Sequence, residues 1–370
     1  MKNQEVKRNG GQRCTDVLVV GGGIAGITAS LELAKLGHNV HLVERGPSIG
    51  GHMSELTKVF PTLDDAQSIL APKMDEVTGT KNVNLYNNAE IEAIQGQPGD
   101  FKVKVLVKPA GKDDDKEKAV DIDAGSIILA TGYQLFDASK IREYGYGTHP
   151  DVITMLDLER ITSASESTNG RLVRPSDNKE VKSIAIALCS GSRDGNRFIP
   201  YCSHICCMYS ITQAISLREQ FGVDVSVFYI DIRAAGRGYE ELYWRAQDSG
   251  VDFIKGKVAE IRQSNGSVMV RAEDLLLAQI IEQEFDLVAL AVPMVPAIGA
   301  DELADKLELP LADDGFVEVK QRQLEPLNTQ LPGIFVAGCA SGPKDIRDSV
   351  ADALGAAAKA SAFLSKNGTN

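Results

Sequence analysis

The sequence predicts an α/β protein built around parallel, doubly wound sheets, and two observations indicate this class. A buried apolar run, Val17–Val20, is followed by a glycine-rich turn, an amphipathic helix and a second apolar run, Val40–Glu44. Continuous apolar strands are typical of parallel sheets that are covered on both faces. A second alternation begins near residue 181, where strands Ile184–Leu188 and Val225–Ile230 flank a helix predicted at Cys206–Glu219. We therefore expect two Rossmann-like units.

The order of the remaining elements predicts that the second unit is inserted in the first. In the first unit, Gly37 ends the helix, and further strands are expected at Phe101–Val107 and Ser126–Gly132. A strand expected at Phe285–Val292 completes the second unit. The chain then returns to the first with a strand and a small-residue helix at 349–364. We predict one domain from residues 1–150 and 298–370, and an inserted domain from 151–297.

Composition restricts the partners and the compartment. The formal net charge of −12 argues against nucleic acid and anionic membranes as partners. No apolar run is long enough for a membrane span, and the polar, basic start does not resemble a secretory signal, so a cytoplasmic location is expected. Six cysteines in 370 residues indicate metal or redox chemistry in a reducing compartment more than a secreted disulfide scaffold.

The turn between the first strand and helix fits a dinucleotide fingerprint. Gly21, Gly23 and Gly26 match G-x-G-x-x-G, in which the glycines permit a tight turn, close approach of a pyrophosphate, and close packing of helix on strand. Glu44 follows at the end of the second strand, where a carboxylate accepts hydrogen bonds from a ribose. The alternative is a glycine-rich turn that binds nothing.

Later motifs favour FAD over NAD as the dinucleotide. Gly50 and Gly51 follow Glu44 closely, and the segments Ala130–Gly132 and Ile334–Gly338 resemble the later FAD motifs of flavoproteins such as thioredoxin reductase. That family usually has an aspartate after the last glycine, which bonds the ribityl chain. Cys339 stands there in this chain, so only the backbone N–H is expected to serve.

Four cysteines replace the nucleotide fingerprint in the second unit. Cys189, Cys202, Cys206 and Cys207 have the spacing C-x12-C-x3-C-C, with the first at a strand end and the last two at a helix start. Four thiolates are the ligand set of a [4Fe–4S] cluster. A helix N-terminus also favours the thiolate form. The alternative is four buried or disulfide-linked cysteines.

At these residues the resemblance becomes specific. The chain resembles the A subunit of heterodisulfide reductase over about residues 16–362, in particular the short form found in sulfur-oxidising, heterodisulfide-reductase-like complexes. The stretches that carry the resemblance are Ile49–Met53, Phe60–Thr62, Ile69–Met74, Gly191–Asp194, Tyr201–Tyr209 with its Cys-Cys-Met-Tyr motif, and Gly342–Ile346.

The resemblance implies an electron-transfer oxidoreductase with FAD, one [4Fe–4S] cluster on the four cysteines in place of NADPH, and no catalytic residue of its own. It further implies a homodimer and partner subunits of the heterodisulfide-reductase B and C types. His52 and Met53 are expected in the flavin loop or in packing, and Lys344 near the flavin or on the surface. The expected FAD contacts are Gly21, Gly23, Ile24, Ala25, Gly26, Glu44, Arg45, Gly50, Gly51, His52, Met53, Ile91, Ala130, Thr131, Gly132, Gly338, Cys339, Lys344 and Ile346.

Several positions depart from methanogen-type relatives. Asp65 and Ser68 stand where those relatives have two cysteines, and the hydrophilic stretch 109–124 replaces an inserted ferredoxin module. We also expect no terminal ferredoxin module after residue 370. Thr212 stands where bifurcating relatives often have a lysine. These departures argue against flavin-based electron bifurcation.

Two other functions remain open from the residues alone. One is a self-contained NAD(P)H-dependent flavin disulfide oxidoreductase with structural cysteines. It is disfavoured because the second unit has no G-x-G-x-x-G and the chain lacks the C-x-x-C of thioredoxin reductases. The other is a non-catalytic scaffold that kept the flavin-domain fold.

Overall fold

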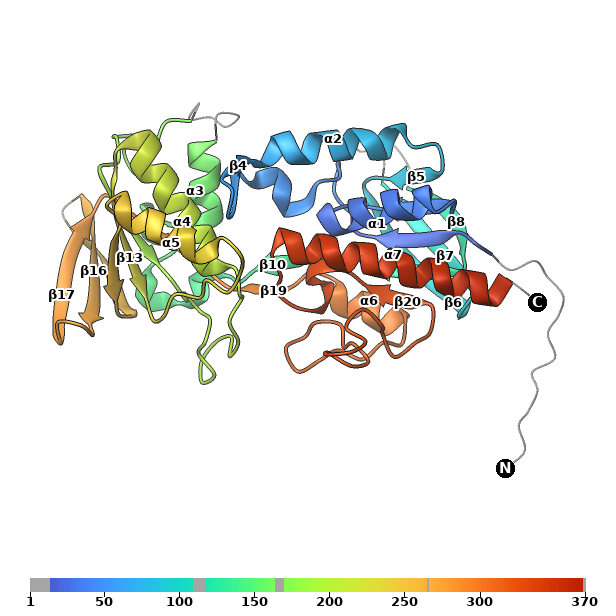
Figure 1. Ribbon diagram of the computed structural model, residues 1–370. Helices are drawn as coiled ribbons and strands as arrows, with labels where there is room; N and C mark the ends of the chain where they lie inside the picture. Colours follow the sequence, from blue (N-terminus) through green and yellow to red (C-terminus); the bar gives the residue numbers. More distant parts are fainter. Residues whose placement is uncertain (1–13, 109–116, 164–169, 265, 369–370) are drawn as a thin grey trace.

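The computed structural model describes residues 14–108, 117–163, 170–264 and 266–368, and it contains two five-stranded parallel sheets (Figure 1). The first has the order β20-β9-β1-β2-β5, and all of its neighbouring strands are parallel. The edge strand β20 comes from the C-terminal part of the chain. The chain therefore returns to the sheet that its N-terminal part began. The strands are β1 (Val17–Val20), β2 (Val40–Val43), β5 (Val83–Tyr86), β9 (Ser126–Leu129) and β20 (Ile334–Val336).

Both faces of the first sheet are covered, which explains why its strands are apolar without alternation. Val17 and Val19 pack toward the helices, whereas Leu18 and Val20 pack toward the opposite layer. This follows from the period of two in a strand. The helices are α1 (Ile24–Lys35), α2 (Ala66–Gly79) and α7 (Ile346–Gly368), and the opposite layer is α6 (Ala300–Lys306) with the antiparallel strands β6 (Ala89–Gln97), β7 (Asp100–Val107) and β8 (Lys118–Ala124).

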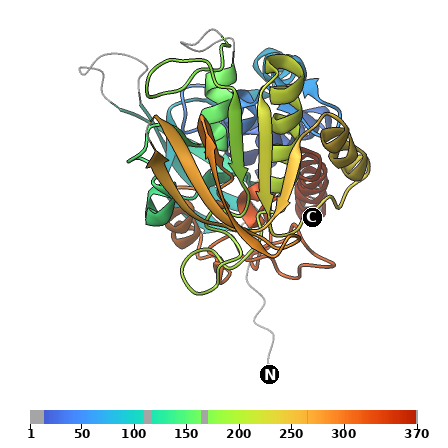
Figure 2. The ribbon, with the colours of Figure 1, turned by 90° about the vertical axis from the view of Figure 1, so that its left-hand side faces the viewer.

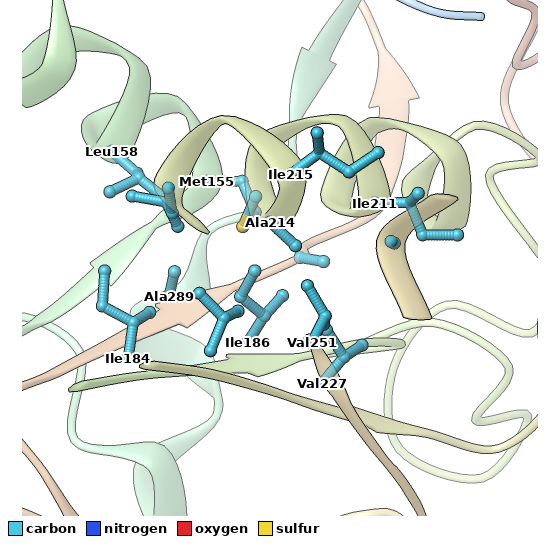
Figure 3. Packing of buried hydrophobic residues seen from close by; sticks show 14 of the residues in the cluster. Met155, Leu158, Ile184, Ile186, Ile211, Ala214, Ile215, Val227, Val251 and Ala289 are labelled. Atoms are coloured by element: carbon cyan, nitrogen blue, oxygen red, sulfur yellow. The ribbon is translucent and has the colours of Figure 1, made fainter. Parts of the chain in front are cut away.

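The second sheet has the order β11-β18-β12-β13-β14 and is also parallel throughout. Figure 3 shows the apolar face of α4 (Cys206–Ser216), with Ile211, Ala214 and Ile215, above Ile184 and Val227 of the sheet. An antiparallel layer of β15, β16 and β17 lies against the other face (Figure 2). The elements are β11 (Val152–Thr154), α3 (Met155–Thr162), β12 (Ser183–Ala187), β13 (Asp224–Tyr229), α5 (Tyr239–Asp248), β14 (Asp252–Lys255), β15 (Val258–Ser264), β16 (Ser267–Asp274), β17 (Gln279–Phe285) and β18 (Leu287–Leu290).

Two short strands carry the chain between the sheets. Strand β10 (Tyr133–Leu135) leads out of the first unit, β19 (Met294–Pro296) leads back, and the two pair antiparallel. An inserted unit requires this arrangement, because the outgoing and returning segments must lie side by side. The inserted topology predicted from the sequence is therefore observed, whereas the exact domain limits stay a prediction.

Some predicted elements differ in detail. The helix predicted at Cys206–Glu219 is α-helical to Ser216 and continues as one π-helical turn, Leu217–Phe221. The strand predicted at Phe285–Val292 comprises the end of antiparallel β17 and the whole of parallel β18. Residues 109–116 of the hydrophilic stretch 109–124 lie outside the described residues. In the described part of the chain, no helix is long and apolar enough to span a membrane.

The short elements that remain lie mostly around the first unit. They are η1 (Gly51–Glu55), β3 (Lys58–Val59), β4 (Asp64–Asp65), η2 (Ala138–Lys140), η3 (Arg142–Tyr144) and η5 (Gly338–Ser341).

Candidate functional site

The three fingerprint glycines have different surroundings. A Cβ on Gly21 would lie 2.2 Å from the Ala130 carbonyl oxygen, and one on Gly26 would lie 1.8 Å from the Gly21 oxygen. Protein atoms therefore require glycine at both positions. A Cβ on Gly23 would meet only Gly51 Cα, at 3.9 Å, which is ordinary contact. Nothing in the protein itself requires glycine there, so the open space beside Gly23 fits a ligand that approaches the backbone.

Gly23 borders a cavity of about 380 Å³ beside the start of α1. The helix has no side-chain N-cap, so its first N–H groups are left for other acceptors. Such a helix start attracts phosphate. The predicted FAD contacts that line this cavity are Gly21, Gly23, Ile24, Ala25, Glu44, Arg45, Gly50, Gly51, His52, Met53, Ala130, Thr131, Gly132, Cys339, Lys344 and Ile346.

The three other predicted contacts lie beside the cavity or beneath it. Ile91 lines a second cavity of about 300 Å³, which shares Glu44, Arg45 and Thr131 with the first. Gly26 packs under the glycine turn. A Cβ on Gly338 would lie 2.9 Å from the Cβ of Ala25, so Gly338 also serves close packing.

The carboxylate of Glu44 accepts hydrogen bonds from the backbone of the first unit. It follows β2, and its two oxygens accept hydrogen bonds from the N–H groups of Gly22 and Gly46, both at 2.6 Å. The carboxylate is therefore fixed in place beside the glycine turn. Each carboxylate oxygen still has a free lone pair that a ribose hydroxyl can use.

Lys344 and Cys339 are tied to the loop before α7. The ammonium group of Lys344 donates to the Gly338 carbonyl at 2.9 Å and to Ser341 Oγ at 2.8 Å, and it pairs with Asp352 at 3.2 Å. Cys339 Sγ lies 3.4 Å from the Lys344 carbonyl oxygen. Burial raises the pKa of the Cys339 thiol. Both side chains thus stabilise the wall of the cavity.

His52 lies on η1, which begins at Gly51 beside Gly23. Its Nδ1 is 2.8 Å from Glu55 Oε2, and its Nε2 is 3.0 Å from the Tyr133 carbonyl oxygen. The imidazole also stacks on the Tyr133 ring, with centroids 4.3 Å apart. His52 therefore connects two predicted flavin motifs that are distant in the sequence.

The four cysteines gather around the start of α4. Cys206 and Cys207 are its first two residues, and Cys189 lies just after β12 with a positive φ of 56°. Cys202 Sγ accepts a hydrogen bond from the His204 N–H at 3.3 Å. Burial raises the pKa of Cys189, Cys206 and Cys207, and for Cys206 and Cys207 charge on the other cysteines raises it further. The four sulfurs are thus electrostatic neighbours.

No group of three His, Cys, Asp or Glu side chains within the described ranges is arranged to hold a single metal ion. The cysteines are nevertheless the concentrated set of soft ligands that an iron–sulfur cluster requires. Helix α4 has no side-chain N-cap, so no N-cap side chain accepts from its first N–H groups.

Cys206 also lines the cavity next to Gly23, together with Ile205 and Tyr209. The thiol set and the predicted flavin site therefore share a wall, which the sequence did not reveal. Other polar or aromatic side chains around the cavity that the sequence analysis did not name include Glu55, Lys58, Tyr133 and Asp345. Tyr209 closes the Cys-Cys-Met-Tyr motif, so its place in the motif was the available signal.

A buried carboxylate joins the two units behind this wall. Glu159 of α3 is fully buried, and its Oε2 accepts from the Thr57 N–H at 3.0 Å and from the Thr57 hydroxyl at 2.7 Å. Gln213 of α4 donates a hydrogen bond to its other oxygen. Burial raises the pKa of Glu159 despite these donors and Tyr209.

Asp65 and Ser68 form a helix cap. They stand where the sequence analysis expects cysteines in methanogen-type relatives. Asp65 is the N-cap of α2 and accepts from the Ser68 N–H at 2.7 Å, and the Ser68 hydroxyl donates to the Asp65 carbonyl at 2.7 Å. Both residues are exposed. This reciprocal pair stabilises the start of the helix. Thr212 is buried within α4, and its hydroxyl donates to the Met208 carbonyl.

Comparison with known proteins gives one family model and a set of curated relatives. The model described as pyridine nucleotide-disulphide oxidoreductase matches residues 15–168. The second iron-sulfur A subunit of the CoB–CoM heterodisulfide reductase of Methanopyrus kandleri is 39% identical over 94% of this chain and 64% of its own length. The A subunit of the H2:CoB-CoM heterodisulfide, ferredoxin reductase of Methanothermobacter marburgensis is 37% identical over 93% of this chain and 63% of its own. The corresponding A subunit of Methanosarcina acetivorans is 35% identical over 98% and 54%.

The chain thus spans less than two thirds of the length of these relatives. Solved structures show the fold. Thioredoxin reductase of T. acidophilum has a TM-score of 0.62 at 18% identity and covers 96% of this chain and 99% of its own. The enzyme of Lactococcus lactis gives the same TM-score and identity over 95% and 99%. The predicted fold class, a thioredoxin-reductase-like α/β protein, is confirmed.

Proposed function

Because this chain is a homologue of the heterodisulfide reductase A subunits, we propose that it is an electron-transfer oxidoreductase subunit that holds FAD and one [4Fe–4S] cluster. Bound FAD exchanges one or two electrons and a cluster exchanges one, so together they pass electrons between two-electron and one-electron carriers. The protein's own residues bind the two groups, place them next to each other and keep water out.

The FAD assignment is supported by the residues around the first cavity. The space beside Gly23, the uncapped start of α1 and the fixed carboxylate of Glu44 suit a pyrophosphate and a ribose. The second cavity, with Ile91, suits the adenine end because it adjoins Glu44. The remaining contacts proposed from the sequence, other than the packing glycines Gly26 and Gly338, line the wall that would enclose the flavin ring and ribityl chain.

The cluster assignment is supported by the donor set. Cys189, Cys202, Cys206 and Cys207 converge at the start of α4, where an NADPH pyrophosphate would lie in a nucleotide-binding homologue. A cubane takes one thiolate on each of four irons, so its ligands lie farther apart than those of a single ion. A site built for a cubane is thus compatible with sulfurs that are not arranged around one metal ion.

One observation carries this proposal: Cys206 is a proposed cluster ligand and lines the proposed flavin cavity. An electron that passes between the proposed cluster and the proposed flavin would have to cross only the wall that Cys206 and Tyr209 form. A structural cysteine could occupy the same place, but it would not explain why three other thiols gather behind it.

The wider assignment follows from the resemblance. We propose a cytoplasmic, heterodisulfide-reductase-like complex in which this chain, as a homodimer, delivers electrons to or from B- and C-type subunits during oxidation of sulfur compounds. Domain limits at 1–150, 151–297 and 298–370 belong to the same proposal. The cap formed by Asp65 and Ser68 supports a single cluster, because it leaves no thiol at that position.

A second candidate is a self-contained NAD(P)H-dependent disulfide oxidoreductase, which the matched family model favours. The second unit argues against it. Its strand β12 and helix α4 are separated by residues 188–205, instead of the tight glycine turn that holds a nucleotide. Reduction of the bound flavin by NADPH or NADH within seconds would favour this candidate.

Purification without oxygen, followed by flavin, iron and sulfide analysis, tests the main proposal. We expect one FAD per chain and about four iron atoms. Flavin without iron would support the second candidate, and protein with neither group would contradict both.

A further inference from the structure

Arg193 lies in the loop of residues 188–205, between two of the proposed cluster ligands. Like Cys189, whose φ is 56°, it has a positive φ, 57°, which is uncommon for a residue other than glycine. The Arg193 N–H donates to the Tyr201 carbonyl at 3.0 Å. Because Cys202 follows Tyr201, this bond brings the part of the loop with Cys202 back beside the part with Cys189.

The side chain of Arg193 joins this loop to the segment that follows β13. Its two terminal nitrogens donate to the two carboxylate oxygens of Asp231, at 2.8 and 3.0 Å. Such a bidentate pair fixes the orientation of the guanidinium group as well as its distance. The Asp231 carbonyl oxygen lies 3.8 Å from Cys207 Sγ, and the Arg233 N–H bonds to the same sulfur. The pair therefore connects the loop with the segment that borders Cys207.

Arg193 also contacts the sulfur of Cys189. Burial keeps the pKa of this thiol above its ordinary value, whereas the charge of Arg193 and hydrogen bonds from the side chains of Ser192 and Arg193 act to lower it. These donors suit a thiolate, which is the form that ligates iron. Hydrogen bonds to the sulfurs also help to set the potential of a cluster, and they favour its reduced form because that form is the more negative.

We infer that Arg193 is a positioning residue for the proposed cluster. Held by Asp231, its guanidinium group fixes the sulfur of Cys189 beside the start of α4 and donates to it. The inference rests on the proposed function, because it needs a cluster on these cysteines. Cys206 and Cys207 are placed by helix α4 itself, whereas Cys189 lies beyond the end of β12. Arg193 supplies the constraint that the strand does not.

This role does not depend on the net charge around Arg193. Asp231 offsets its charge and also lies 3.4 Å from Arg233 Nε. Asp194, the next residue, lies 3.9 Å from Lys257 Nζ. Cations and carboxylates thus alternate here. Loss of the Arg193 side chain is therefore expected to act through the lost N–H donors and the released loop.

The alternative is an ordinary surface ion pair. The side chain of Arg193 is 22% exposed and that of Asp231 is 49% exposed, and pairs of this kind contribute little to stability. Arg197 forms such a pair in the same loop, because it donates to both carboxylate oxygens of Glu143, at 2.6 and 3.2 Å. It links the loop to η3 and not to the segment that borders Cys207, so it provides a matched control.

The first test compares Arg193→Gln with Arg197→Gln in the whole chain purified without oxygen. Electron paramagnetic resonance measures the ratio of reduced to oxidised cluster at fixed ambient potential. In Arg193→Gln we expect this ratio to fall roughly threefold to tenfold, because a charge-assisted hydrogen bond to a ligating sulfur is lost. The FAD content and the urea midpoint of unfolding should stay at wild-type values. Arg197→Gln should leave the ratio unchanged, and equal shifts in both variants would overturn the inference.

A second variant separates position from charge. Asp231→Asn leaves Arg193 in place without its anchor, so the ratio should fall as it does in Arg193→Gln. A purely electrostatic effect has the opposite sign, because loss of a negative charge favours the reduced, more negative cluster. The double variant should add little to either single change, because the two side chains act as one unit. A rise of the ratio in Asp231→Asn, or additive shifts, would overturn the inference.

The conservative variant Arg193→Lys keeps the positive charge but cannot form the bidentate pair. We expect it to shift the ratio as Arg193→Gln does, and full rescue by lysine would overturn the positioning role. A wild-type cluster whose reduction is unchanged in Arg193→Gln would overturn the role of Arg193 and leave the proposed function standing. Iron-free wild-type protein would contradict the proposed function, and the inference with it.

Discussion

The two parallel sheets differ in the connection between a central strand and the helix that follows it. This difference distinguishes the two proposed sites. In the first unit, three residues, 21–23, connect β1 to α1. In the second, residues 188–205 connect β12 to α4. A tight glycine turn allows a phosphate to approach the backbone at the start of α1. The long loop instead places thiols near the equivalent start of α4. Under the proposed function, the same strand–helix geometry would serve two kinds of ligand, which differ in the length of the connecting loop.

Helix capping distinguishes α1 and α4 from α2 and α3. Neither α1 nor α4 has a side-chain N-cap, so the N–H groups at each start are available to ligands. By contrast, α3 starts with a complete capping box between Thr154 and Asp157, and α2 is capped by Asp65. The other helices do not follow this contrast: α5 and α6 also lack a side-chain N-cap, whereas α7, which borders the first cavity, begins after Asp345, whose carboxylate accepts from the Asp348 N–H at 2.7 Å.

The largest expected effect tests the thiol loop. Cys206→Ala should remove most of the roughly four irons per chain that a [4Fe–4S] cluster supplies. FAD should stay bound, because the glycine turn is in the other unit. Cys14→Ala is the control, since Cys14 lies near the Asp123 carbonyl at 3.2 Å, away from α4. If the iron content of the Cys206 variant equalled that of the wild type, Cys206 would not be a cluster ligand. The proposed difference between the two connecting loops would then be wrong.

The glycine turn is tested by Gly23→Val. The first side-chain carbon fits, because its nearest protein atom is 3.9 Å away, but the side chain would occupy the space reserved for the pyrophosphate. We expect near-complete loss of the yellow colour with little loss of stability. Gly79→Val is the control, because Gly79 has open space around it at the end of α2. Full flavin content in the Gly23 variant would place the pyrophosphate elsewhere.

The contact between the units is tested by Glu159→Ala. The variant leaves the Thr57 N–H, the Thr57 hydroxyl and the Gln213 amide without their buried acceptor. Hydrogen bonds to charged groups predict a loss of about 3 kcal/mol in the free energy of unfolding, measured in urea. The exposed Glu240 of α5 gives the control, Glu240→Ala. A loss below about 1 kcal/mol would mean that water replaces the carboxylate.

The sequence predicted the local features of both loops and missed the contacts between them. The glycine turn and the start of α4 at Cys206 follow from spacing and periodicity over a few residues. Glu159 and Thr57 are 102 residues apart, and His52 and Tyr133 are 81 residues apart. The first pair depends on how the inserted unit packs against the first, and the second depends on how the first unit folds on itself, and no local pattern records either contact. This is why the wall shared by Cys206 and the flavin cavity became visible only in three dimensions.

The smallest expected effect concerns a helix that is closed at its start. Asp157 accepts from the Thr154 N–H at 2.9 Å and from its hydroxyl at 2.7 Å, and the Asp157 N–H lies 3.2 Å from Thr154 Oγ1. Thr154→Ala removes the hydroxyl from this capping box, which predicts a loss of about 1 kcal/mol in the free energy of unfolding. The exposed Thr78 of α2 provides the control, Thr78→Ala, with a change within about 0.5 kcal/mol.

Flavin and iron content should stay at wild-type values in the Thr154 variant, because the lost hydroxyl bonds to Asp157, and its loss leaves Met155 and Leu156, which line the first cavity, unchanged. This outcome would show that the capping box of α3 contributes to stability alone. Loss of FAD or iron with the cap would instead show that α3 positions the sites as well as the fold, through Glu159 and Arg160 at its far end.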